Sequence, residues 1–176
     1  MAVYLLYLFA ALIVIILGIY VIFRNLHLEA KLTVPYSKAQ VWHVLEDPLF
    51  LATWDRSVQE VIPTSTGPID VGYTFETIAP KQSGQEEGLR MLYRIIEFEP
   101  NHHVTISLEQ SEMFNNARWI VQVDDSPQGT LITHTMEAEV RFKYFYLVPV
   151  LLLNRQALIT DMDYLRAALD KEISGL

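Results

Sequence analysis

Cysteine is absent from this chain of 176 residues, and no charged side chain occurs between Ala2 and Phe23. Without cysteine there is no disulfide, no cysteine-ligated zinc and no thiol nucleophile, although this does not decide the compartment. Basic residues are scarce as well: 13 Lys and Arg stand against 21 Asp and Glu, for a net charge of -8. An acidic chain is a poor match for nucleic acid, so we expect no nucleic-acid partner.

Motifs of common enzyme classes are also missing. The sequence contains no G-x-S-x-G, no H-E-x-x-H, no phosphate-binding loop and no dinucleotide fingerprint. We therefore expect no cofactor and assign no catalytic residue.

The uncharged stretch "AVYLLYLFAALIVIILGIYVIF" is long enough, as a helix, for the ~30 Å hydrocarbon core of a bilayer. A cleaved signal peptide would need a basic start, a shorter apolar core and a small-residue cleavage site, which favours a retained anchor. Arg24, Lys31 and Lys38 follow the stretch, so the positive-inside rule places the C-terminal part in the cytoplasm. The sequence thus predicts a single-pass membrane protein with an anchor at 1–24 and one domain at 25–176.

The pattern of the domain alternates between strand and helix signals. Residues 27–35 alternate apolar and polar side chains, which indicates a strand. Ser37 is a suitable N-cap for a helix, and Asp47-Pro48 ends that helix and begins a short second one through residue 54. We expect four or five antiparallel strands to follow, among the six candidate segments 57–65, 71–79, 89–99, 104–111, 117–125 and 130–142.

Apolar residues then recur at helical spacing from Leu151 to Ile173, which predicts a long terminal helix. A run of antiparallel strands followed by one long helix is typical of an α+β domain whose sheet curls around that helix.

This order of elements and several motifs resemble the START-like superfamily, also called SRPBCC, which includes polyketide cyclases, pollen-allergen-like proteins and lipid-transfer domains. The similar motifs are "VPYSKAQVWHVLEDPLFLATWDRSV", "VGYTF", "IIEFEPNHHVTI", "GTLITHTMEAEV" and "DMDYLRAAL", and the resemblance covers about residues 28 to 174. The resemblance implies a helix-grip fold with an apolar cavity between the sheet and the terminal helix. It implies no single activity, because the superfamily mixes enzymes, carriers and receptors.

The cavity face follows from strand alternation. Ile132, His134, Met136, Ala138, Val140 and Phe142 share one face of the last strand, which should face the helix. For segment 89–98 two inward faces remain open, one with Met91, Tyr93 and Ile95 and one with Leu92, Ile96 and Phe98. The candidate ligand-binding residues are Trp54, Tyr73, Phe75, Tyr93, Trp119, His134 and Met136.

Trp54 and the two residues after it allow two interpretations. The indole is either a buried core anchor or part of the rim of the ligand entrance, and both can hold. Asp55 and Arg56 are expected to hydrogen-bond within a turn or to face solvent rather than to act as catalytic groups.

His134 is the one ionisable residue on an apolar face. It is either a neutral core histidine or a hydrogen-bonding group for a ligand, and a metal would need further ligands at a suitable spacing. Adjacent His102 and His103 follow "EPN" and indicate a hairpin turn; on a strand they would point to opposite faces. We therefore expect no metal site.

The stretch 145–154, "FYLVPVLLLN", is too short to span a bilayer. It is either the start of the terminal helix, buried under the sheet, or a rim that touches the membrane, with Arg141, Lys143 and Arg155 near headgroups.

These features predict a membrane-anchored protein that binds a hydrophobic small molecule or lipid. Two alternatives stay open: an accessory subunit of a membrane protein complex, and a cyclase- or dehydratase-like enzyme acting on a hydrophobic substrate.

Overall fold

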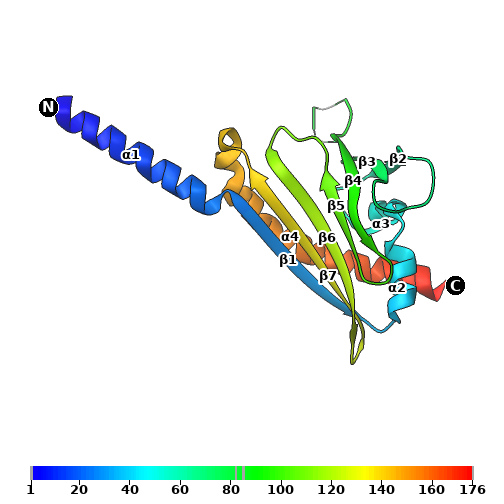
Figure 1. The fold of residues 1–176 in the computed structure, drawn as a ribbon. Coiled ribbons are helices and arrows are strands. Elements are labelled where there is room, and N and C mark those ends of the chain that lie inside the picture. Colours follow the sequence, from blue (N-terminus) through cyan, green and yellow to red (C-terminus); the bar gives the residue numbers. More distant parts are fainter. Residues whose placement is uncertain (1, 82, 85, 176) are drawn as a thin grey trace.

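The computed structural model describes residues 2–81, 83–84 and 86–175; the side chains of residues 2, 3, 5, 6, 153 and 154 lie outside the described part. A seven-stranded antiparallel sheet packs against one long helix, and an N-terminal helix projects away from both (Figure 1). The helices are α1 (Ala2–Phe23), α2 (Lys38–Leu45), α3 (Leu51–Trp54) and α4 (Val148–Ser174), with short 3-10 helices η1 (Pro48–Phe50) and η2 (Phe142–Leu147).

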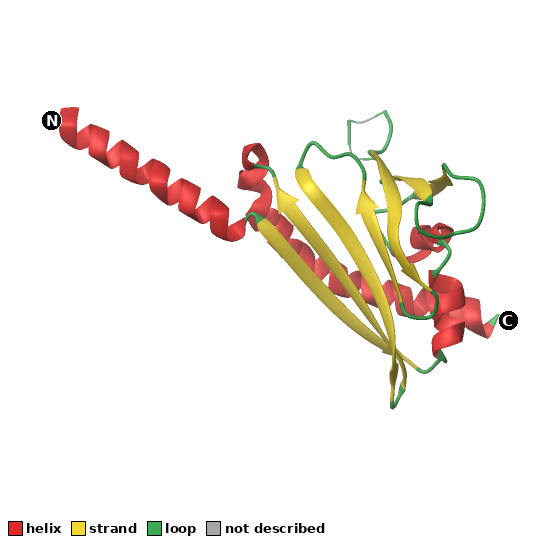
Figure 2. Cartoon of the chain, viewed as in Figure 1, coloured by secondary structure: helices red, strands yellow, loops and turns green. Residues whose placement is uncertain are grey.

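The strands are β1 (Asn25–Val34), β2 (Glu60–Pro63), β3 (Thr74–Ile78), β4 (Arg90–Glu99), β5 (His103–Leu108), β6 (Phe114–Ser126) and β7 (Gly129–Val140). Their order in the sheet is β1-β7-β6-β5-β4-β3-β2, so only β1 pairs with a strand distant in sequence (Figure 1). Figure 2 shows the same view with the strands in yellow and the helices in red. Six strands follow α3 instead of the four or five expected, because segments 57–65 and 71–79 both pair, the first over only four residues.

The caps that the sequence indicates are present. Ser37 and Gln40 form a capping box, in which the Ser37 hydroxyl accepts from the Gln40 N–H and the Gln40 side chain accepts from the Ser37 N–H. Asp47 caps η1 by accepting from the N–H of Leu49 at 2.9 Å. These local bonds begin α2 after Ser37 and η1 after Asp47, as the sequence predicts.

The main core lies between the sheet and α4. Alternate residues of β1, from Leu26 to Val34, are buried, and Val123 and Ile132 are fully enclosed. The α4 side chains in this core are Leu158, Met162, Leu165, Leu169 and Ile173. The predicted α+β helix-grip architecture is confirmed.

The last strand has the predicted inward face with one exception. Ile132, His134, Ala138 and Val140 are buried, whereas Phe142 lies beyond β7, in η2, and is 53% exposed. Its ring contacts the ring of Tyr20 in α1 at 5.0 Å between centroids, because the chain turns out of the sheet at Arg141. The prediction that Phe142 faces the core is therefore wrong.

A β-bulge decides which face of β4 points inward. Tyr93 and Ile95 are buried, so the face with Met91, Tyr93 and Ile95 is the inner one at first. Between Ile95 and Glu97 the register to β5 shifts, and Phe98 then turns inward onto Trp42, at 5.6 Å between ring centroids. The first alternative thus holds for Tyr93 and Ile95, whereas of the second only Phe98 turns inward and Ile96 is 38% exposed.

Helix α1 carries the uncharged stretch. Its large apolar side chains are exposed by 41% to 78% where they are described, because most of the helix touches nothing else in the molecule. Only its C-terminal end meets the domain: the Tyr20 hydroxyl donates to the carbonyl of Val140 at 3.2 Å, and Arg24 lies 3.3 Å from Glu139.

Within the part of the chain that the structure describes, no helix combines the length and the apolarity needed to cross a membrane. The predicted transmembrane anchor is therefore not confirmed.

The stretch 145–154 is only partly buried, and its predicted contact with a membrane stays a prediction. Val148 is buried at the start of α4 and packs in a second small core with Leu26, Ala138 and Val140. Tyr146, Val150 and Leu152 are exposed. One side of the stretch is thus core and the other faces outward.

Candidate ligand-binding site

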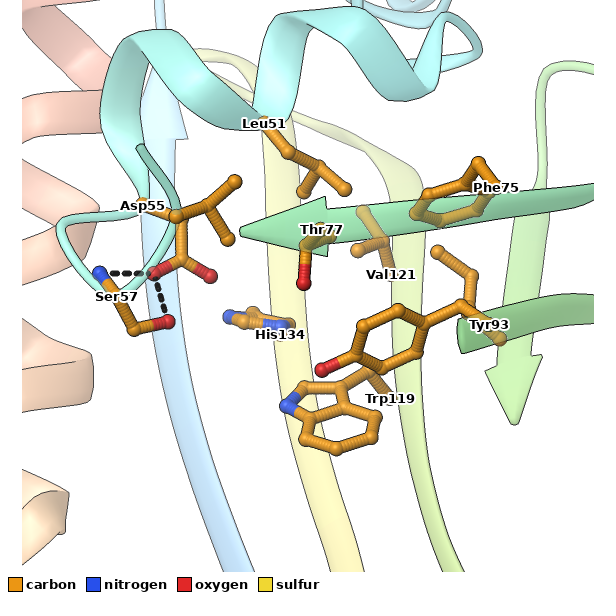
Figure 3. A pocket seen from close by; sticks show the side chains of 11 residues that line it. Leu51, Asp55, Ser57, Phe75, Thr77, Tyr93, Trp119, Val121 and His134 are labelled. Carbon is orange, nitrogen blue, oxygen red and sulfur yellow. Dashed lines mark hydrogen bonds between the residues drawn. The ribbon is translucent and has the colours of Figure 1, made fainter. Parts of the chain in front are cut away.

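A small cavity lies between the inner face of the sheet and the segment that connects α3 to β2 (Figure 3). Its volume is about 60 Å³. The lining residues are Leu51, Asp55, Ser57, Val58, Phe75, Thr77, Tyr93, Ile106, Trp119, Val121 and His134. Most of these are apolar, with polar groups from Asp55, Ser57, Thr77, Tyr93 and His134 reaching the same space.

The cavity differs in place and size from the one that the resemblance implies. No described residue of α4 lines it, because the apolar residues of that helix pack directly on the sheet. Pockets for drug-sized ligands usually measure ~300–1,000 Å³, so this cavity as it stands takes only a few atoms or waters. A second space of about 30 Å³ lies beside it, lined by residues that include Trp54, Ile106 and Val121.

The predicted ligand-binding residues are only partly brought together. Phe75, Tyr93, Trp119 and His134 line the cavity. Trp54 lines the second, smaller space instead. Tyr73 and Met136 line neither space and pack, half-buried, against the main core.

Three polar lining residues were missed from the sequence: Asp55, Ser57 and Thr77. Thr77 had a usable signal, since it stands two residues after Phe75 on β3 and therefore shares its inward face. Asp55 and Ser57 had no such signal, because side chains in a turn do not alternate regularly and the sequence does not predict where they point.

His134 is enclosed, with 5% of its surface exposed. Burial lowers the pKa of its imidazole to about 4, while the negative charge of Asp161 opposes this effect weakly. The ring is therefore neutral at pH 7. Its Nδ1 is buried and has no hydrogen-bond partner among the described residues. Such an orphaned group costs roughly 1–3 kcal/mol, and a ligand that hydrogen-bonds to it recovers that cost.

Two hydroxyl groups share the cavity with His134. Burial raises the pKa of Tyr93 to about 12; the nearby Thr77 hydroxyl acts in the opposite direction, and the charge of Asp55 adds to the rise. The Thr77 hydroxyl is itself buried without a hydrogen-bond partner among the described residues. The Tyr93 hydroxyl donates to the sulfur of Met91 at 3.5 Å. Both hydroxyls therefore have hydrogen-bonding capacity to offer a ligand.

Trp54 packs against His134 in the interior of the domain. The indole is 3% exposed, and its ring meets the imidazole edge to face at 5.5 Å between centroids. Trp54 is thus a buried core residue, and its side chain also lines the smaller cavity of about 30 Å³.

The turn after Trp54 is held by its own polar groups, as the sequence indicates. Asp55 accepts from the N–H of Ser57 at 2.8 Å and from its hydroxyl at 2.6 Å (Figure 3). Arg56 does not pair with Asp55 but with Asp161 of α4, at 2.9 Å, and its guanidinium lies 5.1 Å from the ring centroid of Tyr164. The rim of the cavity is thereby tied to the terminal helix.

The expectation that His102 and His103 point apart is wrong. Their Nδ1 atoms lie 3.0 Å from one another, because His102 belongs to the turn and only His103 belongs to β5.

Comparison with known proteins agrees with this architecture. The family model described as "Polyketide cyclase / dehydrase and lipid transport" matches residues 25–163. The chain belongs to this family. It is thus an SRPBCC domain of the hydrophobic-ligand-binding and cyclase type, and the resemblance noted in the sequence is confirmed for residues 25–163. No curated protein matches the chain in sequence.

Solved structures share the fold at low identity. The Zhui aromatase/cyclase from Streptomyces sp. R1128 has a TM-score of 0.67 and 13% identity, over 85% of this chain and 96% of that one. The structure of Ara h 8.0201 has a TM-score of 0.60 and 11% identity, over 86% of this chain and 99% of that one. The di-domain aromatase/cyclase StfQ of the steffimycin pathway has a TM-score of 0.65 and 11% identity. This chain spans about half the length of StfQ, 52%.

Proposed function

We propose that this chain binds a hydrophobic small molecule bearing one polar group, in the cavity beneath the α3–β2 segment. We also propose that α1 attaches the domain to a membrane. The observation that carries the ligand proposal is the buried Nδ1 of His134, which has no hydrogen-bond partner among the described residues and lies in a mostly apolar cavity beside the hydroxyls of Thr77 and Tyr93. Buried polar groups are normally satisfied, and a ligand is a common reason for an exception.

The ligand enters by moving the turn that roofs the cavity. Asp55, Ser57 and Val58 belong to a connection outside the sheet, whereas the other walls are mainly paired strands. Displacing this turn breaks the Arg56–Asp161 ion pair and the two local hydrogen bonds of Asp55. Contacts with the ligand replace them. An exposed ion pair of this kind is worth ~0–1 kcal/mol, so the barrier it adds is small.

The test measures what the purified full chain retains. The chain is produced in a lipid-containing host, purified in detergent micelles, and its small molecules are extracted and weighed by mass spectrometry. We expect a discrete compound in molar amount with the wild type and its loss with Val121→Ile, which adds a methyl group to the wall of the cavity. Val123→Ile on the same strand is the matched control, because Val123 is buried but does not line the cavity.

If no compound distinguishes the wild type from Val121→Ile, ligand binding in this cavity is refuted. Thermal unfolding of both variants shows whether either substitution has damaged the fold.

The membrane part of the proposal is supported by the exposed apolar side chains of α1. A contiguous run of exposed Leu, Ile, Val and Phe side chains is normally covered by lipid or protein, because monomers in water rarely expose large apolar patches. Lipid is favoured because the helix stands clear of its own domain and carries Tyr4, Tyr7 and Tyr20 near its ends. The basic residues after α1 would place the domain on the cytoplasmic side.

Flotation with phosphatidylcholine vesicles tests this part. We expect the full chain to float and a Leu12→Arg, Val14→Arg variant to stay with the soluble fraction. Ile159→Arg, an exposed apolar position of α4, is the matched control and should float as the wild type does. A wild-type chain that does not float refutes the membrane association, and a protein complex that covers α1 then becomes the alternative.

An enzyme of the cyclase or dehydratase type is the second candidate. It is favoured by the shared cavity of a neutral imidazole, His134, and a protonated phenol, Tyr93, which form an acid and base pair in principle. If a retained compound is found, His134→Leu should then keep binding but stop its conversion, whereas in a carrier the substitution weakens binding alone.

A further inference from the structure

Three potential metal ligands converge at the turn between β4 and β5. The Nδ1 atoms of His102 and His103 lie 3.0 Å apart. The Glu99 carboxylate oxygen Oε2 lies 3.4 Å from Nδ1 of His102 and 3.5 Å from Nδ1 of His103. The three atoms therefore form a nearly equilateral triangle with its face open.

The backbone of the turn explains why adjacent histidines share one point in space. The N–H of His102 donates to the carbonyl of Glu99 at 3.0 Å, which closes a four-residue turn. Pro100 and Asn101 occupy its centre, and Asn101 has a φ of 60°, as a type II turn requires at its third position. His102 is thus outside the strand and escapes the alternation that would separate it from His103.

The size of the triangle fits a tetrahedral zinc ion. Zinc binds histidine nitrogen and carboxylate oxygen at ~2.0–2.2 Å, which for a tetrahedron puts ligand atoms ~3.3–3.5 Å apart. The observed separations are 3.0, 3.4 and 3.5 Å. We propose that Glu99, His102 and His103 bind one zinc ion, with the fourth position open to solvent.

A second layer of carboxylates supports the site. Nε2 of His102 lies 4.0 Å from Asp124, and Nε2 of His103 lies 3.9 Å from Glu97. Zinc-binding histidines usually present their other ring nitrogen to such a group, directly or through water. Both carboxylates are held in place: Glu97 accepts from Thr105 at 2.7 Å and Asp124 from Gln122 at 2.8 Å.

The local charge favours a cation as well. Glu97, Glu99 and Asp124 gather around the two rings, and within the described residues no Lys or Arg lies within 4.0 Å of any of them. A divalent ion neutralises most of this charge. The site lies on the hairpin turn, away from the cavity of His134, and is independent of the proposed ligand.

The experiment uses the full chain in detergent micelles, stripped with chelator and dialysed against zinc. We expect one zinc ion per chain, and at least ~10-fold weaker binding in Glu99→Gln, His102→Ala and His103→Ala. His43→Ala is the matched control: His43 is also exposed, 3.4 Å from Glu46, but has no second histidine beside it. Its variant should bind zinc as the wild type does.

Cobalt serves as a second probe, because tetrahedral cobalt bound by nitrogen and oxygen gives strong visible absorption bands. These bands should appear with the wild type and be absent in His103→Ala. Failure of the wild type to bind zinc, or equal binding by all three ligand variants, overturns the proposal and leaves a hydrogen bond between the two rings as the reason for their contact. Far-UV circular dichroism confirms that each variant is folded.

Discussion

The indole of Trp54 and the imidazole of His134 meet edge to face at 5.5 Å between ring centroids, in the interior of the domain. This contact joins α3 to β7 and excludes water from a histidine that has no partner for its Nδ1 among the described residues. The buried pair therefore makes the stability of the domain sensitive to pH and to the loss of either ring.

Stability should fall as the pH drops from about 6.5 to about 4. The folded pKa of His134, about 4, lies below its ordinary value of 6.5, so the unfolded chain binds the proton first. The contribution of the neutral ring is complete above pH 6.5 and is lost as the pH falls through this window. The full contribution of the neutral imidazole to the free energy of unfolding is on the order of 3 kcal/mol. Urea unfolding at several pH values in this range measures the free energy of unfolding. In His134→Leu this free energy should differ less between pH 6.5 and pH 4 than in the wild type.

Trp54→Ala should lower the free energy of unfolding by ~3–5 kcal/mol, the usual cost of removing a buried tryptophan. It should also admit water to His134, so that the pH dependence shrinks. A double-mutant cycle with His134→Leu then gives non-additive losses, because the two rings are in contact. Additive losses, with an unchanged pH dependence, would show that Trp54 does not control the environment of the imidazole.

Two buried threonines should respond in opposite ways to replacement by valine. Thr105 donates to Glu97 at 2.7 Å, so Thr105→Val should cost about 1–2 kcal/mol. Thr77 has no partner for its hydroxyl among the described residues, so Thr77→Val should be neutral or stabilising. Chemical unfolding of the two variants compares them. A cost for Thr77→Val equal to that for Thr105→Val would mean that a group in the cavity satisfies the hydroxyl.

Gly129→Ala should be far more harmful than Gly67→Ala. Both glycines have a φ near 120°, so alanine is strained at either position by about 1–3 kcal/mol. Only at Gly129 would the added Cβ also overlap the carbonyl of Val34 and lie 2.9 Å from Cα of Pro35; at Gly67 it meets nothing. We expect a loss above ~4 kcal/mol for Gly129→Ala, measured by thermal unfolding. Similar losses at both positions would show that the backbone relieves the overlap.

Much of the fold is determined locally and could be predicted from the sequence. The capping box at Ser37, the break at Asp47-Pro48 and the alternation of β1 and β7 depend on residues a few positions apart. For the same reason Phe75 and His134 were predicted to face inward. These features need no knowledge of what lies across the core.

The tertiary structure decided what depends on the register between strands and on turns. The bulge between Ile95 and Glu97 exchanges the faces of β4, and a turn makes His102 and His103 neighbours on one side. The volume of the cavity depends on how α4 and the α3–β2 segment pack on the sheet, and here no described residue of α4 lines it. Side-chain period fixes direction within an element, but bulges, turns and packing between elements change which residues meet, and these arise only when distant segments come together.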